Sequence, residues 1–232
     1  MVKVTYLYHS GFMIETFSSC LVFDYYTAGG AYNNIDINKL YGKNLFVFVS
    51  HAHQDHYDKE IFKWKNKNAK YVISNDCQVD EDVENVTMVS PNKGYVVDGI
   101  AIETLKSNDE GVAFIVHVDG TTIYFSGDLN WWHWNGESDE FNDMIKNQYT
   151  SEIDKIKNLK VDVGFVPVDV RLEDKYILAI DYLMKNVEVK YIFPMHFWQD
   201  HKVYEYLVKD ERTAEYRNRI MKIDEPGQEF VL

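Results

Sequence analysis

The chain has 232 residues, and 46% of them are hydrophobic, so it is long enough and apolar enough to fold around a substantial core. Its 24 basic residues stand against 37 acidic ones, and a net charge of −13 disfavours binding to nucleic acid. It has two cysteines, no apolar stretch of membrane-spanning length and no signal-peptide pattern before the first strand. We therefore expect a cytoplasmic protein that does not enter a membrane.

Short strands are predicted over most of the first half of the chain. A short helix is expected at residues 59–64, and the clearest local unit is a hairpin in which Asp119-Gly120 joins strands at residues 112–118 and 121–125. Apolar runs separated by turn signals predict the other strands, at residues 2–8, 12–16, 20–24, 45–49, 71–74, 86–89, 95–97 and 100–105.

Longer helices are predicted in the second half. Helical spacing of apolar residues indicates helices at residues 137–159, 172–185 and 201–221, with strands between them at residues 161–167 and 191–194. No repeat or linker divides the chain, so we expect a single domain over its whole length, 1–232. Strands with interspersed helices predict an α/β fold whose sheets are covered by helices on their outer faces.

The most informative segment is SHAHQDH at residues 50–56, directly after a predicted buried strand. It places three imidazoles and one carboxylate close together, and zinc and related divalent ions prefer such ligands. Core packing rarely explains so dense a cluster, because each histidine would need a buried polar partner. The segment therefore predicts a metal site at the end of a strand.

Two further strand ends carry metal-capable side chains. The second strand of the hairpin ends at Ser126-Gly127-Asp128, where the glycine allows a close backbone approach and the strand end holds the carboxylate firmly. The strand at residues 191–194 stops just before a histidine. With the first segment, these residues form a set of six candidate ligands: His51, His53, Asp55, His56, Asp128 and His196.

The HxHxDH run, the later Gly-Asp and the final histidine resemble the metallo-β-lactamase superfamily over nearly the whole chain, and Asp24 at the end of the third strand adds to the likeness. The most similar branch is the small one that includes ascorbate-6-phosphate lactonase-like hydrolases. The resemblance implies a four-layer αβ/βα sandwich and one or two divalent metal ions. It assigns the ligands by motif: His51 and His53 to one ion, Asp55, His56 and His196 to the other, and Asp128 to both.

One ligand of the family pattern is absent. The family usually has another histidine between the first motif and the Gly-Asp, and His117 is the only histidine in that interval. If Asp119-Gly120 is a two-residue turn, His117 pairs near Thr122. That position lies six residues from Asp128, or roughly 20 Å along the strand. His117 is therefore expected at the far end of the hairpin.

Three alternatives could account for the absent histidine. Asp109 or Glu110 could supply an oxygen ligand, His133 could enter from the loop after Asp128, or the first ion could be weakly held so that a single-ion site remains. Imidazole-rich ligation favours zinc, whereas an oxygen-rich set would favour a harder ion such as manganese.

The resemblance implies a metal-dependent hydrolase that acts on a small ester, lactone, amide or phosphoester, anionic substrates included. Asp55 would orient or deprotonate the attacking water. Asp24 would steer a ligating imidazole through its free N–H, or would only form the turn after its strand.

Substrate contacts are expected from the aromatic loop after the Gly-Asp, where Trp132 and Trp134 could form a pocket wall. Arg171 could bind a substrate carboxylate or phosphate, or could pair with Asp169 instead.

Two other functions fit the same motifs. A metal-binding protein of this fold that has lost catalysis would explain the absent histidine. A nuclease of the same superfamily would need a basic groove or an added clamp domain, and the charge of −13 disfavours it. Neither of the remaining histidines discussed, His9 in a turn near the site and His201 at the start of the last helix, is expected to be a ligand.

Overall fold

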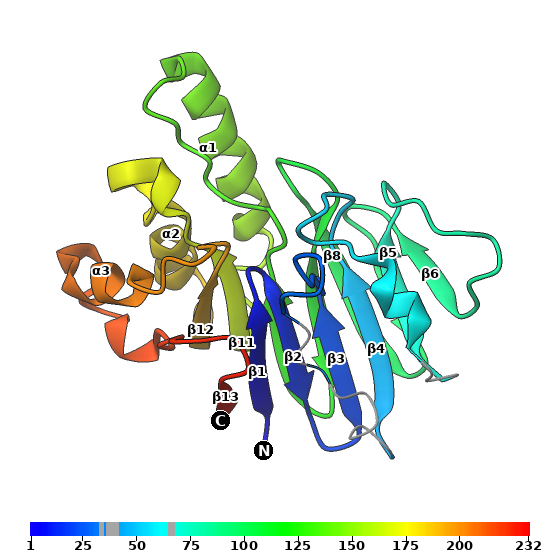
Figure 1. The fold of residues 1–232 in the computed structure, drawn as a ribbon. Helices are drawn as coiled ribbons and strands as arrows, with labels where there is room; N and C mark the ends of the chain where they lie inside the picture. Colours follow the sequence, from blue (N-terminus) through cyan, green and yellow to red (C-terminus); the bar gives the residue numbers. More distant parts are fainter. Residues whose placement is uncertain (33–34, 36–41, 65–67) are drawn as a thin grey trace.

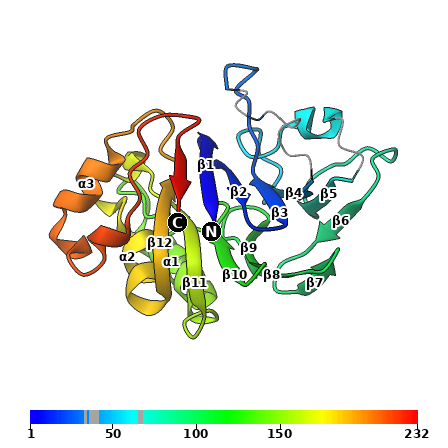
Figure 2. The same cartoon turned by 90° about the horizontal axis from the view of Figure 1, so that it is seen from below.

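Two β-sheets face each other in the computed structural model of the chain, which describes residues 1–32, 35, 42–64 and 68–232. Figures 1 and 2 show the α-helices gathered beside one sheet and a 3-10 helix, η2, on the outer side of the other. This arrangement confirms the predicted α/β fold of two sheets with helices outside. The helices are α1 (Asp139–Asp154), α2 (Leu178–Asn186), α3 (Val203–Lys209) and η2 (Lys59–Lys63).

The first sheet has the strand order β13-β1-β2-β3-β4-β5-β6. Strands β1 to β3 and the β1–β13 pair are antiparallel, and β3 to β6 run parallel. Strand β13 was missed by the sequence analysis, and it brings the C-terminus beside the N-terminal strand (Figure 2). The bounds are β1 (Lys3–Tyr8), β2 (Gly11–Glu15), β3 (Ser19–Phe23), β4 (Asn44–Val49), β5 (Lys70–Ser74), β6 (Val86–Val89) and β13 (Glu229–Val231).

The second sheet has the order β12-β11-β10-β9-β8-β7. The register pairs His117 with Thr122 and confirms the predicted two-residue hairpin turn. Both turn residues have positive φ, 49° at Asp119 and 75° at Gly120, as a tight hairpin turn of this kind requires. The bounds are β7 (Gly94–Val97), β8 (Ile100–Lys106), β9 (Val112–Val118), β10 (Thr121–Phe125), β11 (Lys160–Pro167) and β12 (Glu188–Met195).

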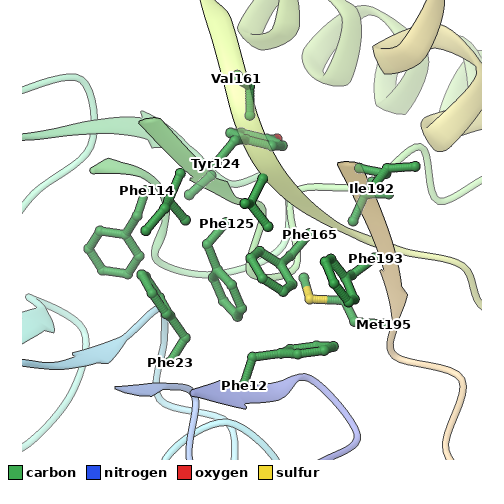
Figure 3. Packing of buried hydrophobic residues seen from close by; sticks show 14 of the residues in the cluster. Phe12, Phe23, Phe114, Tyr124, Phe125, Val161, Phe165, Ile192, Phe193 and Met195 are labelled. Atoms are coloured by element: carbon green, nitrogen blue, oxygen red, sulfur yellow. The ribbon is translucent and has the colours of Figure 1, made fainter. Parts of the chain in front are cut away.

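Phenylalanine rings fill the space between the sheets. Figure 3 shows Phe12 and Phe23 of the first sheet facing Phe125 and Phe165 of the second. The ring centroids are 4.7 Å apart for Phe23 and Phe125, and 4.6 Å apart for Phe12 and Phe165. Because these rings are fully buried and in contact, aromatic packing is a main source of adhesion between the sheets.

Successive side chains of β4 point into two different hydrophobic cores. Phe46 and Phe48 point between the sheets, whereas Val47 and Val49 point outward and pack in the same cluster as Ile61 of η2. Successive side chains of a strand point to opposite faces, so a strand buried on both faces is apolar throughout. This explains the unbroken apolar run that precedes the SHAHQDH segment.

The continuous helix predicted at residues 201–221 is wrong. Helix α3 ends at Lys209, and the Asp210 side chain then accepts a hydrogen bond from the Arg212 N–H to begin the 3-10 turn η4 (Glu211–Thr213). The Thr213 hydroxyl donates to the Leu207 carbonyl at 2.8 Å, which satisfies an acceptor at the helix end. A second 3-10 turn, η5 (Arg217–Arg219), follows.

The helix predicted at residues 172–185 is also divided. A 3-10 helix, η3 (Val170–Lys175), contains Glu173 at a φ of 55°, and α2 begins only at Leu178. Glutamate pays a steric cost in this conformation, so the break reflects tertiary packing that local periodicity does not reveal.

Cys20 and Cys77 are buried free thiols, as predicted. Among the described residues, none of the helices combines the length and the apolar character needed to span a bilayer.

Candidate metal centre

Three buried histidines surround one buried carboxylate where strand ends of the two sheets meet. The Nε2 atoms of His51, His56 and His196 lie 3.5, 3.3 and 3.6 Å from the carboxylate oxygens of Asp128. His51 and His56 follow β4 of the first sheet, whereas Asp128 follows β10 and His196 follows β12 of the second. The structure therefore brings together four of the six candidate ligands from both sheets.

Buried oxygen atoms hold two of these imidazoles from the first sheet. Asp24, after β3, lies 2.7 Å from His56 Nδ1 and also accepts hydrogen bonds from the Ser50 N–H at 2.7 Å and the Ser50 hydroxyl at 2.6 Å. Ser50 Oγ in turn lies 2.8 Å from His51 Nδ1. With their Nδ1 atoms engaged, both rings direct Nε2 towards Asp128. Asp24 thus takes the steering position predicted for it.

Asp169 holds the third imidazole in the same manner. Its Oδ2 lies 3.0 Å from His196 Nδ1. The guanidinium of Arg171 also binds Asp169, with Nε 2.9 Å from Oδ1 and Nη2 in contact with Oδ2. Arg171 is therefore engaged in the pairing that the sequence analysis considered as the alternative to substrate binding.

Two glycines make room for the end of β4. A Cβ atom at Gly111 would lie 2.0 Å from the Ser50 carbonyl oxygen, and one at Gly127 would lie 2.7 Å from Ser50 Cβ. Both glycines have positive φ, 67° and 51°. Since no larger residue fits at these distances, the approach of Asp128 to the histidines depends on them.

Three residues of the site have strained backbones. The φ angles of His9, Asp24 and His196 are 56°, 42° and 62°, in the left-handed region that non-glycine residues avoid. Such conformations persist where surrounding structure imposes them, and they cluster at functional sites.

Asp55 and His9 lie on the other side of His56. Asp55 Oδ2 is 3.2 Å from His9 Nε2 and 3.9 Å from His56 Nε2. The ligand atoms of His9, Asp55, His56 and His196 all lie within 4.8 Å of one another. His9, expected only as a turn residue, is thus a member of the cluster.

His53 and the loop before β9 form the open side of the site. His53 Nδ1 is 3.0 Å from His51 Nε2, and its Nε2 is 3.6 Å from Glu110 Oε2. The side chain of His53 is 43% exposed, so it is far less enclosed than the other histidines of the cluster. Asp109 lies near Asp128 and His53, and burial together with the Asp128 charge raises its pKa.

The structure leaves His117, His133 and His201 outside the cluster. His117 lies at the far end of the β9–β10 hairpin, with Nδ1 3.1 Å from the Thr122 hydroxyl oxygen, as the sequence geometry predicted. His133 belongs to none of the metal-capable groups found among the described residues, and it does not line the cavity beside them. Of the three alternatives for the absent histidine, the acidic loop and the weakly held ion remain.

A cavity of about 330 Å³ opens over the cluster. Trp132 and Trp134 form part of its wall as parallel rings with centroids 6.2 Å apart, and the Trp132 indole N–H donates to the Asp128 carbonyl at 3.0 Å. Two of the aromatic residues expected to contact substrate therefore line this cavity. Its lining comprises His53, Asp55, Asn108, Asp109, Asp128, Trp132, Trp134, Phe141, Ile145, Arg171, His196 and Trp198.

The charges of the site are unevenly distributed. Burial disfavours the charged form of His56, but Asp128 and Asp24 outweigh it and raise its pKa to about 9. Burial and the neighbouring His56 lower the pKa of His51 to about 3. Burial also opposes ionisation of Asp128, yet the three histidines outweigh it and hold its pKa below the usual range.

Burial and pairing also have opposite effects on the pKa values of His9 and Asp55. Burial lowers the pKa of His9 to about 4 despite its contact with Asp55. Burial works against ionisation of Asp55, but His9 and His56 overcome it and lower its pKa. Asp55 is therefore an ionised carboxylate at neutral pH.

Several buried polar atoms have no hydrogen-bond partner among the described residues, and they include His56 Nε2, Asp128 Oδ1 and both ring nitrogens of His9. Leaving such atoms unpaired costs about 1–3 kcal/mol each. A cation bound among them would satisfy these acceptors. The residues present therefore fit a divalent metal ion.

The sequence analysis missed two members of this arrangement, His9 and Asp169. A signal existed for each: His9 precedes Ser10-Gly11 at the end of β1, and Asp169 follows β11 just as Asp24 follows β3. Both sit at strand ends, but their neighbours come from distant parts of the chain, so the sequence pattern alone did not place them in the site.

Comparison with known proteins identifies relatives that are named metal-dependent hydrolases. A UPF0173 metal-dependent hydrolase of Thermococcus kodakarensis is 29% identical over 141 residues, which are 55% of this chain and 62% of that protein. A relative of the same name from Korarchaeum cryptofilum is matched over 60% of its length, so these two alignments span less than two thirds of the relatives. A UPF0173 metal-dependent hydrolase of Pyrococcus furiosus is 26% identical over 213 residues, 85% of each chain.

Solved structures share the fold. Igni18, a metallo hydrolase of Ignicoccus hospitalis, superimposes with a TM-score of 0.64 at 18% identity and covers 100% of this chain and 99% of its own. The metallo-β-lactamase fold protein YhfI of Bacillus subtilis gives 0.62 at 12% identity, with 100% of both chains covered. A family model described as the β-lactamase superfamily domain matches residues 3–141. Because this match covers more than half of the 232 residues, the chain belongs to the β-lactamase superfamily.

Proposed function

We propose that the chain is a metal-dependent hydrolase of a small molecule. One observation carries the proposal: three buried imidazoles, each fixed through Nδ1 by an oxygen atom, direct Nε2 to within 3.3 to 3.6 Å of the same buried carboxylate. The relatives named metal-dependent hydrolases support it. The proposed ligands are His51, His53, Asp55, His56, Asp128 and His196.

Zinc is the proposed ion. Imidazoles outnumber carboxylates in the cluster, and a borderline-soft ion such as zinc prefers this mixture over the oxygen-rich sets that suit manganese. His51, His56 and His196 are buried, so a positive charge on any of them would lie close to a bound ion with little screening by water. The ion would repel that charge and would therefore favour the neutral form of each imidazole, which is the form that binds metal.

A bound divalent ion would acidify water and polarise the bond under attack. The chain itself supplies the remaining functions. Asp55 borders the cavity, and His9 and His56 lower its pKa and keep it ionised, so its carboxylate can accept a hydrogen bond from the attacking water and orient it. Trp132 closes one side of the cavity, with its ring centroid 5.4 Å from that of His196, and thereby limits access of bulk water.

The cavity favours a neutral substrate with an apolar group. Its lining includes the apolar groups of Trp134, Phe141, Ile145 and Trp198, and Arg171 has its Nε and Nη2 engaged by Asp169. Asp55, Asp109 and Asp128 contribute acidic groups to the same lining. We therefore favour a carboxylic ester or lactone over a phosphoester, and the ascorbate-6-phosphate lactonase-like branch stays a prediction from resemblance. The cytoplasmic location expected from the sequence also stays part of the proposal, supported by the free thiols.

The test combines metal analysis with turnover. Purified protein would be loaded with zinc and assayed on p-nitrophenyl butyrate, an acyl homoserine lactone and bis-p-nitrophenyl phosphate. Asp128→Asn should lower kcat/KM by at least about 100-fold, the scale of one catalytic group. The matched control is His117→Ala, since His117 is a histidine at the far end of the hairpin and should leave activity unchanged.

Each outcome has a meaning. Zinc binding without turnover on this panel would contradict the hydrolase and support a metal-binding protein that has lost catalysis. Preferential cleavage of the phosphodiester would favour the phosphoesterase alternative and refute the proposed ester or lactone preference.

A further inference from the structure

His9 is the buried histidine that the proposed ligand set does not use. It lies in the turn between β1 and β2, has no exposed surface, and its carbonyl accepts a hydrogen bond from the His196 N–H at 3.4 Å. Its ring centroid is 4.3 Å from that of His196 and 4.1 Å from the nearest ring centroid of Trp198. The ring is thus held in place by packing against both of these residues.

Hydrogen bonding within the chain satisfies this imidazole poorly. Neither ring nitrogen has a well-formed hydrogen bond among the described residues, and the polar contact of Nε2 is with the Asp55 carboxylate, whose Oδ2 lies 3.2 Å away. A buried polar group without a partner is costly to keep. Its backbone at a φ of 56° adds a second cost. Both costs are explained if the imidazole binds something that the polypeptide does not supply.

The position of His9 makes the two halves of the centre unequal. On its side, ligand atoms of His9, Asp55, His56 and His196 lie within 4.8 Å of one another, which gives three enclosed imidazoles and a carboxylate. The other group contains His51, His53 and Asp128, with His53 43% exposed. The loop that should complete this exposed group contains Asn108, Asp109 and Glu110 but no histidine.

We propose that His9 is a metal ligand, and that the group of His9, Asp55, His56 and His196 holds one ion tightly while the His51 side holds a second ion weakly or not at all. This inference rests on the proposed metal-dependent function. It differs from the ligand pattern implied by family resemblance, because the extra imidazole comes from the β1–β2 turn. The absent histidine would have completed the group with His51 and His53, whereas His9 belongs to the group with Asp55, His56 and His196.

Zinc affinity measured on protein stripped of metal tests the assignment directly, by competition with a chromophoric chelator. Asparagine tolerates positive φ, so His9→Asn removes the imidazole with little change in the turn. His9→Asn should weaken the tightest binding step by more than the roughly 10–100-fold loss that changes to outer-shell partners cause. His53→Asn should leave that step unchanged, and His117→Asn, the distant control, should leave every step unchanged.

Cobalt spectra separate a ligand from a positioning residue. Loss of a nitrogen ligand should change the visible absorption of the cobalt-loaded protein in His9→Asn. His9→Gly, whose backbone accepts this φ, should regain zinc affinity when free imidazole is added. This second variant and far-UV circular dichroism of the metal-free proteins keep the test decisive if the first variant folds poorly.

Three results would overturn the assignment. The tightest step and the cobalt spectrum could be unchanged in His9→Asn while hydrolysis falls, which would make His9 a positioning residue for Asp55. His53→Asn could weaken the tightest step as much as His9→Asn does. Wild-type protein could bind no zinc at all, which would refute the proposed function as well.

Discussion

Gly111 sits where an added methyl group would press on the metal centre. Its φ is 67°, and a Cβ atom would lie 2.0 Å from the Ser50 carbonyl oxygen and 2.6 Å from His51 Cβ. These two neighbours are a backbone oxygen and the first atom of a side chain, so neither can rotate away. Gly111→Ala must therefore displace the end of β4, which carries His51, or the loop that carries Asp109.

The chain offers a matched control at Gly120, whose φ is 75° and whose added Cβ would meet nothing within 4 Å. Gly120→Ala should cost only the left-handed conformation, about 1–2 kcal/mol in free energy of unfolding. Gly111→Ala adds overpacking, typically about 1–3 kcal/mol, so its total loss should be about 2–5 kcal/mol. For a protein of this size, each kcal/mol lowers the midpoint of thermal unfolding by about 2–4 °C.

Urea unfolding of the metal-free proteins measures these losses, and zinc competition measures the effect on the site. Gly111→Ala should lose zinc affinity as well as stability, whereas Gly120→Ala should lose stability alone. Equal losses of stability in the two variants, with unchanged zinc affinity in both, would refute the inference that close packing at Gly111 sets the position of His51.

Three further predictions concern the core, the hairpin and the cavity. Phe125→Ala should reduce the free energy of unfolding by about 3–5 kcal/mol and Phe125→Leu by clearly less, measured by urea titration, because the alanine leaves a cavity beside Phe23. Asp119 accepts hydrogen bonds from the Thr16 hydroxyl at 2.6 Å and the Ser18 N–H at 2.8 Å, which lower its pKa. The ionised Asp119 stabilises the fold fully at pH values above its unfolded-state pKa of about 3.9, and this stabilisation is lost as pH falls through its lower folded-state pKa. Asp119→Asn should therefore make the free energy of unfolding depend less steeply on pH in the acid range, and an unchanged dependence would contradict this. Trp134→Ala should raise KM more for p-nitrophenyl butyrate than for p-nitrophenyl acetate, since Trp134 adds apolar surface to the cavity lining; equal effects would remove it from the substrate site.

Local sequence predicted those elements whose geometry is decided locally. The β9–β10 hairpin has the predicted bounds because Asp119-Gly120 by itself favours a tight turn with positive φ. The helix predicted at residues 201–221 breaks because Asp210 caps a new turn and Thr213 bonds back to Leu207. Polar side chains that form hydrogen bonds with the backbone compete with continuation of the helix, and the spacing of apolar residues gives no sign of this competition.

The residues of the candidate site were likewise predicted where they lie in local motifs and missed where they do not. His51, His56, Asp128 and His196 were identified because each lies in a motif at a strand end, and the structure brings them together. The place of His9 depends on contacts with His196 and Trp198, more than 180 residues later in the chain. No local pattern specifies a pairing over that separation.

The same contacts explain why the site couples the two sheets. Asp24 fixes His56 on the first sheet and Asp169 fixes His196 on the second, yet both Nε2 atoms face Asp128. An ion bound between them would add a further link between the sheets, which hydrogen bonds from His196 N–H to the His9 carbonyl and from Val112 N–H to the Ser50 carbonyl also join at this end. Metal affinity and docking of the sheets would then be linked, since binding only to the docked state stabilises that state. A histidine from the β1–β2 turn strengthens this link, because it ties the first sheet to the loop after β12 at the ion itself.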